Sequence, residues 1–190
     1  PFKTNTHLKK RTKPKLNNIL ITCGGGGRPS SKLFFKIIKQ IVQEVYRFDK
    51  SIKFTIITGN SNEGLKLPNS KIIKWSNNFF KLLNQHDLVI SEAGYFTILD
   101  LLNAKIPAIL IPGERRIDNQ ELRALKYQES GCGYMYFPNE NPKDIVGRIL
   151  SLKKERINIS NLLKDYSRLN ENIFNKSPKL KEELIKFLEL

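Results

Sequence analysis

The sequence is poor in cysteine and histidine, with two of each in 190 residues. Cys23 and Cys132 lie far apart and form no Cys-x-x-Cys pair, so the sequence indicates neither a zinc site nor a disulfide-stapled fold. We therefore expect a reducing, intracellular setting and no requirement for a metal or another cofactor. His7 lies in a basic N-terminal tract and His86 precedes an apolar strand, so neither is predicted to be a catalytic base.

Long apolar runs and acidic residues are also scarce. No run reaches the roughly 18 to 20 apolar residues of a membrane-spanning helix. No charged-then-apolar leader is present, and we expect a cytoplasmic protein without a signal peptide. Lys and Arg total 33 against 18 Asp and Glu, a net charge of +15. This charge suits phosphorylated ligands or an anionic membrane, while the lack of RNA-binding or finger motifs argues against nucleic acid.

The sequence does contain a regular alternation of short apolar runs and helical patterns. Strands that are apolar throughout are typical of a parallel sheet covered on both faces. We therefore predict an α/β fold, a doubly wound Rossmann-like parallel sheet of about six strands with helices on both faces. Predicted strands include 18–23, 52–58, 71–75, 87–91 and 107–111, and predicted helices are 33–45, 77–84, 95–103, 118–130 and 141–152.

A single core is expected from the length of the chain. We interpret residues 1–17 as a basic tether, 18–170 as the Rossmann-like domain and 171–190 as an amphipathic C-terminal helix. Helical patterns cover 158–169 and 178–190. The last helix suits packing against this domain or a missing partner domain, or, as the less common use, an anionic membrane surface.

Two segments at predicted strand ends are candidates for binding a phosphate, because ligands of doubly wound sheets bind beyond the carboxyl ends of strands. The first is the glycine run 24–27, which allows close backbone approach and leads through Arg28 to a helix start. Its spacing is not that of a dinucleotide fold, and a tight turn is the alternative.

The second candidate is Ser91-Glu92-Ala93-Gly94-Tyr95-Phe96-Thr97. Small Ala93 and Gly94 would let a diphosphate reach the amides of the following helix start. Asp100 lies one turn further on the Thr97 side and could accept hydrogen bonds from ribose hydroxyls, or be an ordinary exposed carboxylate.

The stretch SEAGYFTILDLLNAKIPAILIP, followed by DNQ and RALKYQESGCG, resembles the C-terminal, donor-binding domain of GT-B glycosyltransferases, especially family 28. That family includes the lipid-linked N-acetylglucosaminyltransferase of peptidoglycan synthesis, to which this chain is similar over most of residues 1–137. The resemblance implies inverting transfer of an N-acetylhexosamine or hexose from a UDP-sugar to a lipid-linked or other acceptor.

The resemblance also assigns roles to matching positions. The implied contacts are Gly24, Gly25, Gly26, Gly27, Arg28, Gly94, Tyr95, Phe96 and Thr97 for the donor diphosphate, Asp100 for the ribose, Trp75 and Ser76 for the base, Asp118, Asn119 and Gln120 for the sugar, and Lys3 near the nucleotide. Three positions depart from the family pattern, and one of them is Asp100, which is one methylene shorter than the family's glutamate. Gly26 stands where serine is usual, and Glu121 stands where the second of two glutamines is usual.

The family's catalytic base comes from an N-terminal domain that this sequence does not contain. Pro1-Phe2-Lys3 resembles the interdomain Pro-Val-Arg of the family, which would place the start of the chain at a domain junction. We therefore assign no catalytic residue and expect the chain to need an N-terminal acceptor domain or a separate acceptor-binding subunit for activity. The expected location is the cytoplasm, either free or peripheral on the inner face of an anionic membrane.

Two other functions stay open on the sequence. One is a nucleotide-sugar hydrolase or epimerase of the same architecture, since the Asn119-Gln120 pair is also similar to that of a hydrolase that removes UDP from an amino sugar. The other is a nonenzymatic module that binds phosphates or an anionic surface. Release of UDP without an acceptor would favour the first, and salt-sensitive vesicle binding would favour the second.

Overall fold

A computed structural model describes residues 16–61, 64–104, 106–114, 118–137 and 139–154. The elements alternate along the chain as the sequence predicted, and the α/β class is confirmed. They are β1 (Asn18–Thr22), α1 (Pro29–Phe48), β2 (Lys53–Ile57), β3 (Ser70–Ile73), α2 (Phe79–Leu83), β4 (Leu88–Ser91), α3 (Tyr95–Ala104), β5 (Ala108–Leu110), α4 (Gln120–Glu129), β6 (Gly133–Met135) and α5 (Pro142–Lys154).

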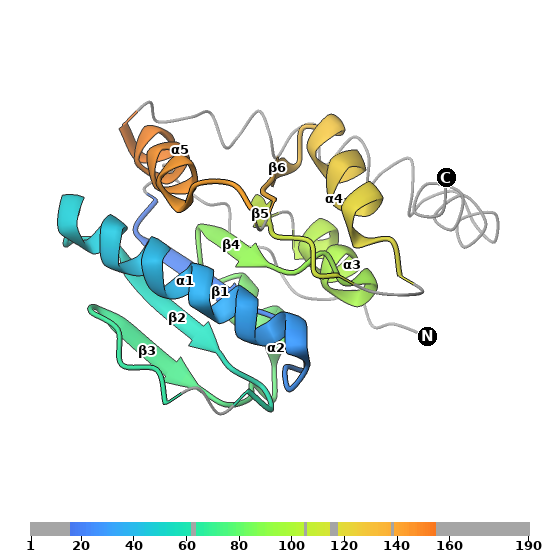
Figure 1. Cartoon of the computed structure of the whole chain (residues 1–190), viewed down its shortest axis with the longest axis horizontal. Coiled ribbons are helices and arrows are strands. Elements are labelled where there is room, and N and C mark those ends of the chain that lie inside the picture. The colour runs from blue at the N-terminus through green and yellow to red at the C-terminus, as the bar shows by residue number, and fades with distance from the viewer. Residues whose placement is uncertain (1–15, 62–63, 105, 115–117, 138, 155–190) are drawn as a thin grey trace.

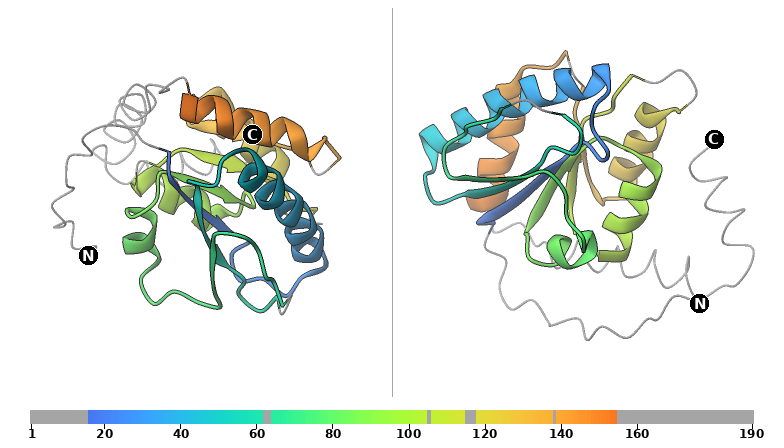
Figure 2. Two further views of the ribbon diagram at one scale, coloured as in Figure 1. Left: turned by 90° about the vertical axis from the view of Figure 1, so that its left-hand side faces the viewer. Right: turned by 90° about the horizontal axis from the view of Figure 1, so that it is seen from below.

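The six strands form one sheet in the order β3-β2-β1-β4-β5-β6, and every neighbouring pair is parallel. The chain leaves β1 towards β2 and later returns to place β4 on the other side of β1. This reversal is the topological switch point at which doubly wound folds bind ligands. Helices α1 and α5 cover one face, while α2, α3 and α4 cover the other (Figures 1 and 2).

Both faces of the sheet are buried, which explains the uninterrupted apolar strands. In β1, Ile19 and Ile21 pack into the core under α1 and α5, whereas Leu20 packs into the core on the opposite face. All three side chains are completely buried. The same alternation continues in β4, where Ile90 and Val89 point to opposite cores. The doubly wound architecture is therefore confirmed.

The first helix is longer than its apolar pattern. It starts at Pro29, the helix start that the sequence indicated, and extends to Phe48. Proline is well suited to this position because its missing N–H would have no helical partner there. Before β1, Leu16 is already buried, and the backbone N–H groups of Asn17 and Asn18 donate to Asp87 over 3.0 and 2.9 Å.

The predicted tether through residue 15 and the predicted helices at 158–169 and 178–190 lie outside the described residues. Within the described ranges, no helix combines the length and the apolar character that crossing a membrane requires. His86 is buried between Leu82 and Thr55, with its two ring nitrogens 2.7 Å from the Leu82 carbonyl oxygen and 2.8 Å from the Thr55 hydroxyl. These contacts agree with the structural role predicted for His86.

Candidate functional site

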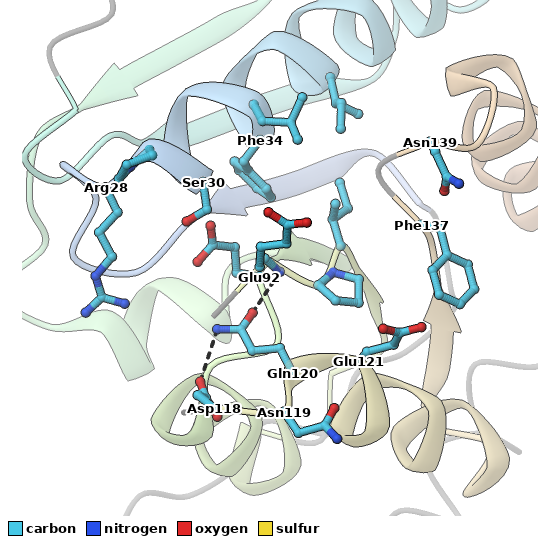
Figure 3. Close-up of a pocket in the computed structure, with 17 residues that line it drawn as sticks. Arg28, Ser30, Phe34, Glu92, Asp118, Asn119, Gln120, Glu121, Phe137 and Asn139 are labelled. Atoms are coloured by element: carbon cyan, nitrogen blue, oxygen red, sulfur yellow. Dashed lines mark hydrogen bonds between the residues drawn. The ribbon is translucent and has the colours of Figure 1, made fainter. Parts of the chain in front are cut away.

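A cleft of about 1240 Å³ opens at the carboxyl end of the sheet, beside the switch point between β1 and β4 (Figure 3). Its walls come from the start of α1, the ends of β4 and β5, the start of α4 and the segment after β6. The lining residues are Arg28, Pro29, Ser30, Leu33, Phe34, Ile37, Glu92, Ile111, Pro112, Gly113, Glu114, Asp118, Asn119, Gln120, Glu121, Phe137 and Asn139. Four predicted site residues are among them: Arg28, Asp118, Asn119 and Gln120.

The glycine run packs against the loop that follows β2. The amide of Gly24 donates to the Thr22 hydroxyl over 3.1 Å, and the amide of Gly27 donates to the Ser61 hydroxyl over 3.0 Å. The carbonyl of Gly25 accepts from the Asn60 amide over 2.9 Å. Two of the backbone donors that the sequence offered to a diphosphate therefore already bond within the protein.

The packing of this loop explains why glycine replaces the family's serine at position 26. Gly26 has a φ of +64°, and a Cβ added there would lie 2.6 Å from the carbonyl oxygen of Thr58. A serine would be strained by its backbone conformation and would collide with a neighbouring strand end. The departure at Gly26 thus reflects close packing of two loops.

The second predicted phosphate segment runs from the end of β4 into the first turn of α3. No acidic residue occupies that turn, so the positive end of the helix dipole meets no negative charge from the helix itself. The ring of Tyr95 packs edge-on against Phe96 at a centroid distance of 5.5 Å, and Phe96 is 79% exposed. Gly94 has only the Thr97 hydroxyl within 4 Å of an added Cβ, at 3.6 Å. Backbone access at this turn suits an anion.

Asp100 lies one turn further along α3 and is half-buried. Burial raises the pKa of its carboxyl. A hydroxyl donor from a ligand would stabilise the ionised form and offset that cost. This position suits the ribose role that the resemblance assigned, which stays a prediction.

The DNQ segment at the start of α4 is largely occupied by bonds within the protein. The guanidinium of Arg123 donates to Asp118 over 2.5 Å and to the carbonyl of Ala93 over 2.6 Å. Gln120 is buried; its carbonyl oxygen accepts from the Gly113 amide over 3.0 Å, and its amide group donates to Asp118 over 3.3 Å. The side-chain oxygen of Asn119 caps α4 by accepting from the Leu122 amide.

These bonds bring the two halves of the sequence motif together. Arg123 links the start of α4 to the segment before α3, and its guanidinium lies 6.0 Å from the centre of the Tyr95 ring. The predicted sugar contacts thus have a structural role, and Asn119 presents its amide group at the exposed rim of the cleft. Asp118 and Gln120 were predicted from the sequence as site residues, whereas Arg123 was not.

The buried carboxyl of Glu92 is a further group at the cleft for which the sequence predicted no role. Glu92 directly follows β4, is 3% exposed and lines the cleft together with Ser30. Burial raises its pKa, while Ser30 and the nearby charge of Arg28 oppose this increase. Glu92 could have been found from the sequence, because it is a carboxylate directly after a predicted strand, at the end of the sheet where ligands bind.

The predicted base contacts lie at the end of β3, away from the cleft lining. Trp75 is 51% exposed, and the Ser76 hydroxyl accepts from the Asn78 amide over 3.3 Å. Lys3 lies outside the described residues. No group of three or more His, Cys, Asp and Glu side chains in the described part of the chain could hold a metal ion.

A model of the glycosyltransferase family 28 C-terminal domain matches residues 18–182 of the chain. A UDP-N-acetylglucosamine--N-acetylmuramyl-(pentapeptide) pyrophosphoryl-undecaprenol N-acetylglucosamine transferase from Prochlorococcus marinus (strain MIT 9215) is 30% identical over 187 residues, which cover 92% of this chain and 49% of the relative. The relative of the same name from Elusimicrobium minutum is 24% identical over 148 residues, with 74% and 40% covered. The chain spans about half the length of the first of these relatives.

Solved structures show the same fold. The crystal structure of MurG from Acinetobacter baumannii has a TM-score of 0.63 at 14% identity, covering 94% of this chain and 51% of that one. The glycosyltransferase VinC in complex with DTDP has a TM-score of 0.60 at 14% identity, covering 94% and 43%. In both, the match occupies about half of a longer glycosyltransferase.

Proposed function

The chain belongs to glycosyltransferase family 28, whose C-terminal domain it represents, and on this premise we propose that it binds the nucleotide-sugar donor of a glycosyl transfer reaction. The observation that carries the proposal is the cleft at the switch point between β1 and β4: the starts of α1 and α4 line it, and α3 begins three residues after Glu92, which also lines it. Helix starts bind phosphate, and polar groups at the ends of β4 and β5 suit hydroxyls.

The donor diphosphate would bind at the first turn of α3. Gly94 leaves room for close approach, and the amides of the following residues would donate to the phosphate oxygens together with the Thr97 hydroxyl. Asp100, on the same helix, would accept hydrogen bonds from the ribose. Trp75 and Ser76 would contact the base, and a uracil nucleotide is the expectation from the family.

The chemical contribution of this domain would be electrostatic. During transfer, negative charge grows on the leaving nucleoside diphosphate, and fixed backbone amides stabilise that charge without having to reorganise. Arg28 lines the neighbouring cleft and adds a more distant positive charge. In this proposal backbone amides and basic side chains stabilise the leaving group, and no metal is required.

The acceptor site and the catalytic base would lie in the remaining half of the enzyme. The relatives are named for transfer of N-acetylglucosamine to a pyrophosphoryl-undecaprenol carrier, and they are about twice as long as this chain. We therefore propose an N-terminal domain or separate subunit that holds a lipid-linked acceptor at the cytoplasmic face of a membrane. The complete enzyme would transfer a hexose or N-acetylhexosamine.

Isothermal calorimetry with UDP-, TDP-, GDP- and CMP-sugars tests the donor site. We expect one class of nucleotide sugar to bind, and Thr97→Val or Asp100→Ala to weaken binding about tenfold, as expected for the loss of one good hydrogen bond. Asp144→Ala, an exposed change on α5, is the matched control and should leave the affinity unchanged. Absence of binding at millimolar concentrations of every sugar nucleotide would refute the proposal.

A further inference from the structure

The carboxyl of Glu92 occupies the part of the cleft that faces the start of α1. It follows β4, and β4 pairs with β1, so Glu92 is brought across from Ser30 although 62 residues separate them in the sequence. Figure 3 shows Glu92 in the middle of the cleft, between Ser30 on α1 and Gln120 on α4. The Ser30 hydroxyl is close enough to this carboxyl to lower its pKa, and Glu92 is 3% exposed.

The start of α1 attracts an anion but contains none of its own. Its first turn has no acidic residue, and the N-cap residue Arg28 makes no side-chain capping bond. The positive end of the helix and the Arg28 guanidinium both favour a nearby negative charge. Glu92 supplies this charge from β4, so the protein itself places a carboxylate where a ligand phosphate would otherwise be favoured.

The surrounding groups hold Glu92 in place and add to the local negative charge. A Cβ added at Gly113 would lie 3.1 Å from a Glu92 carboxyl oxygen, so the backbone after β5 closely confines the carboxyl on that side. Asp118 is close enough to raise the pKa of Glu92, whereas Arg28 and Ser30 lower it. An anionic group of a ligand would be repelled here by Glu92 and Asp118, and the buried setting would screen this repulsion poorly.

We propose that Glu92 is a specificity-determining residue that makes the α1 end of the cleft accept the hydroxyls of an uncharged sugar and reject anionic groups. This inference rests on the proposed donor function. In that proposal the diphosphate binds at the first turn of α3, which has no acidic residue of its own, whereas Glu92 already supplies a carboxylate at the start of α1. The sugar then faces Glu92, whose carboxylate accepts hydrogen bonds from hydroxyls and repels a sugar carboxylate.

The ratio of affinities for UDP-glucose and UDP-glucuronate tests this inference, because the two ligands differ by one carboxylate at the sugar. Both are titrated by calorimetry into the protein at pH about 8 and low ionic strength, where repulsion is least screened. We expect the protein to prefer UDP-glucose and Glu92→Gln to reduce that preference about tenfold, the effect of one moderate charge contact. Arg28→Gln should increase the preference, because it removes the cation beside Glu92.

Glu129→Gln is the matched control. It removes the same charge from an exposed position at the end of α4, outside the cleft, and should leave the affinity ratio unchanged. If both nucleotide sugars bind and Glu92→Gln leaves their ratio unchanged, the role of Glu92 is refuted while the donor site stands. If the unaltered protein binds no sugar nucleotide in the UDP, TDP, GDP and CMP panel, the proposed function itself fails, and this inference fails with it.

Discussion

The ion pair between Arg123 and Asp118 leads to a quantitative prediction about the DNQ segment. Arg123 is 7% exposed, and its guanidinium donates both to Asp118 and to the buried carbonyl of Ala93. Through these two bonds it joins α4 to the connection between β4 and α3. We predict that Asp118 stabilises the site by holding Arg123, and that it makes little direct contact with the donor.

The size of the effect follows from burial. Arg123→Met would leave the Ala93 carbonyl without this donor, at a cost of about 1 to 3 kcal/mol. The Asp118 side chain is 32% exposed, so water would partly replace its lost partner, and this bond adds about 1 kcal/mol. We therefore expect Arg123→Met to lower the free energy of unfolding by about 2 to 4 kcal/mol.

Asp118→Asn keeps the shape and removes the charge. We expect a loss of about 1 to 2 kcal/mol, because Arg123 remains buried beside a neutral partner. In the double variant Arg123→Met/Asp118→Asn the two losses should not add, and the coupling free energy should be about 1 kcal/mol. Urea unfolding of the four proteins, followed by circular dichroism, measures all three quantities.

Calorimetry with UDP separates a structural role from a binding role. UDP carries the diphosphate and base but no sugar, so a structural role for Asp118 predicts that Asp118→Asn changes UDP and UDP-sugar affinities by the same small factor. An unchanged unfolding free energy together with a selective loss of UDP-sugar affinity would refute our reasoning. In that case the sugar contact implied by the family resemblance would be the better description of Asp118.

Three further predictions concern residues that follow β1 and β4 at the carboxyl end of the sheet. Gly26→Ala should destabilise the protein by about 1 to 2 kcal/mol more than Gly24→Ala, since both residues have positive φ but only Gly26 has a carbonyl 2.6 Å from an added Cβ; urea unfolding compares them. Burial raises the pKa of Cys23 to about 11. Iodoacetamide at pH 8 should therefore alkylate Cys23 at least about 100-fold more slowly in the native protein than in the urea-unfolded protein. Equal rates would contradict the burial of this thiol. Burial raises the pKa of Glu92, so keeping this carboxyl ionised lowers the free energy of unfolding at pH values above that pKa. Glu92→Gln should therefore stabilise the protein at pH 8, and the gain should shrink as the pH falls through the raised pKa. Urea unfolding at several pH values measures this.

The fold could be predicted because its signals are local. Strands such as β1 and β4 are apolar throughout since both sheet faces are covered, and Pro29 marks the first turn of α1. The sequence also placed Arg28 and Asn119 beyond the carboxyl ends of predicted strands, and both line the cleft there. Such reasoning needs only the order of elements and the rule that parallel strands end at one edge.

The contacts within the site could not be predicted in the same way, because they join distant segments. Gln120 bonds to Gly113 and Arg123 reaches back 30 residues to Ala93, and neither pairing leaves a periodic signal in the sequence. Gly26 was noticed as a departure from the family, but the obstacle it avoids belongs to the Thr58 loop. Glu92 stood inside the recognised motif, yet its proximity to Ser30 depends on the pairing of β1 with β4.

Charge in this protein acts over two distances and with opposite signs. The net charge of +15 would attract an anionic nucleotide sugar from solution, an effect that falls with salt. Within the cleft, however, four carboxylates accompany the cation Arg28 in the lining: Glu92, Glu114, Asp118 and Glu121. An anion drawn towards the protein is therefore repelled from the α1 end of the cleft and favoured at α3, whose first turn has no acidic residue. Overall charge would thus govern the rate at which the donor meets the protein. Glu92 would govern its orientation, with the diphosphate at the start of α3 and the sugar at the start of α1.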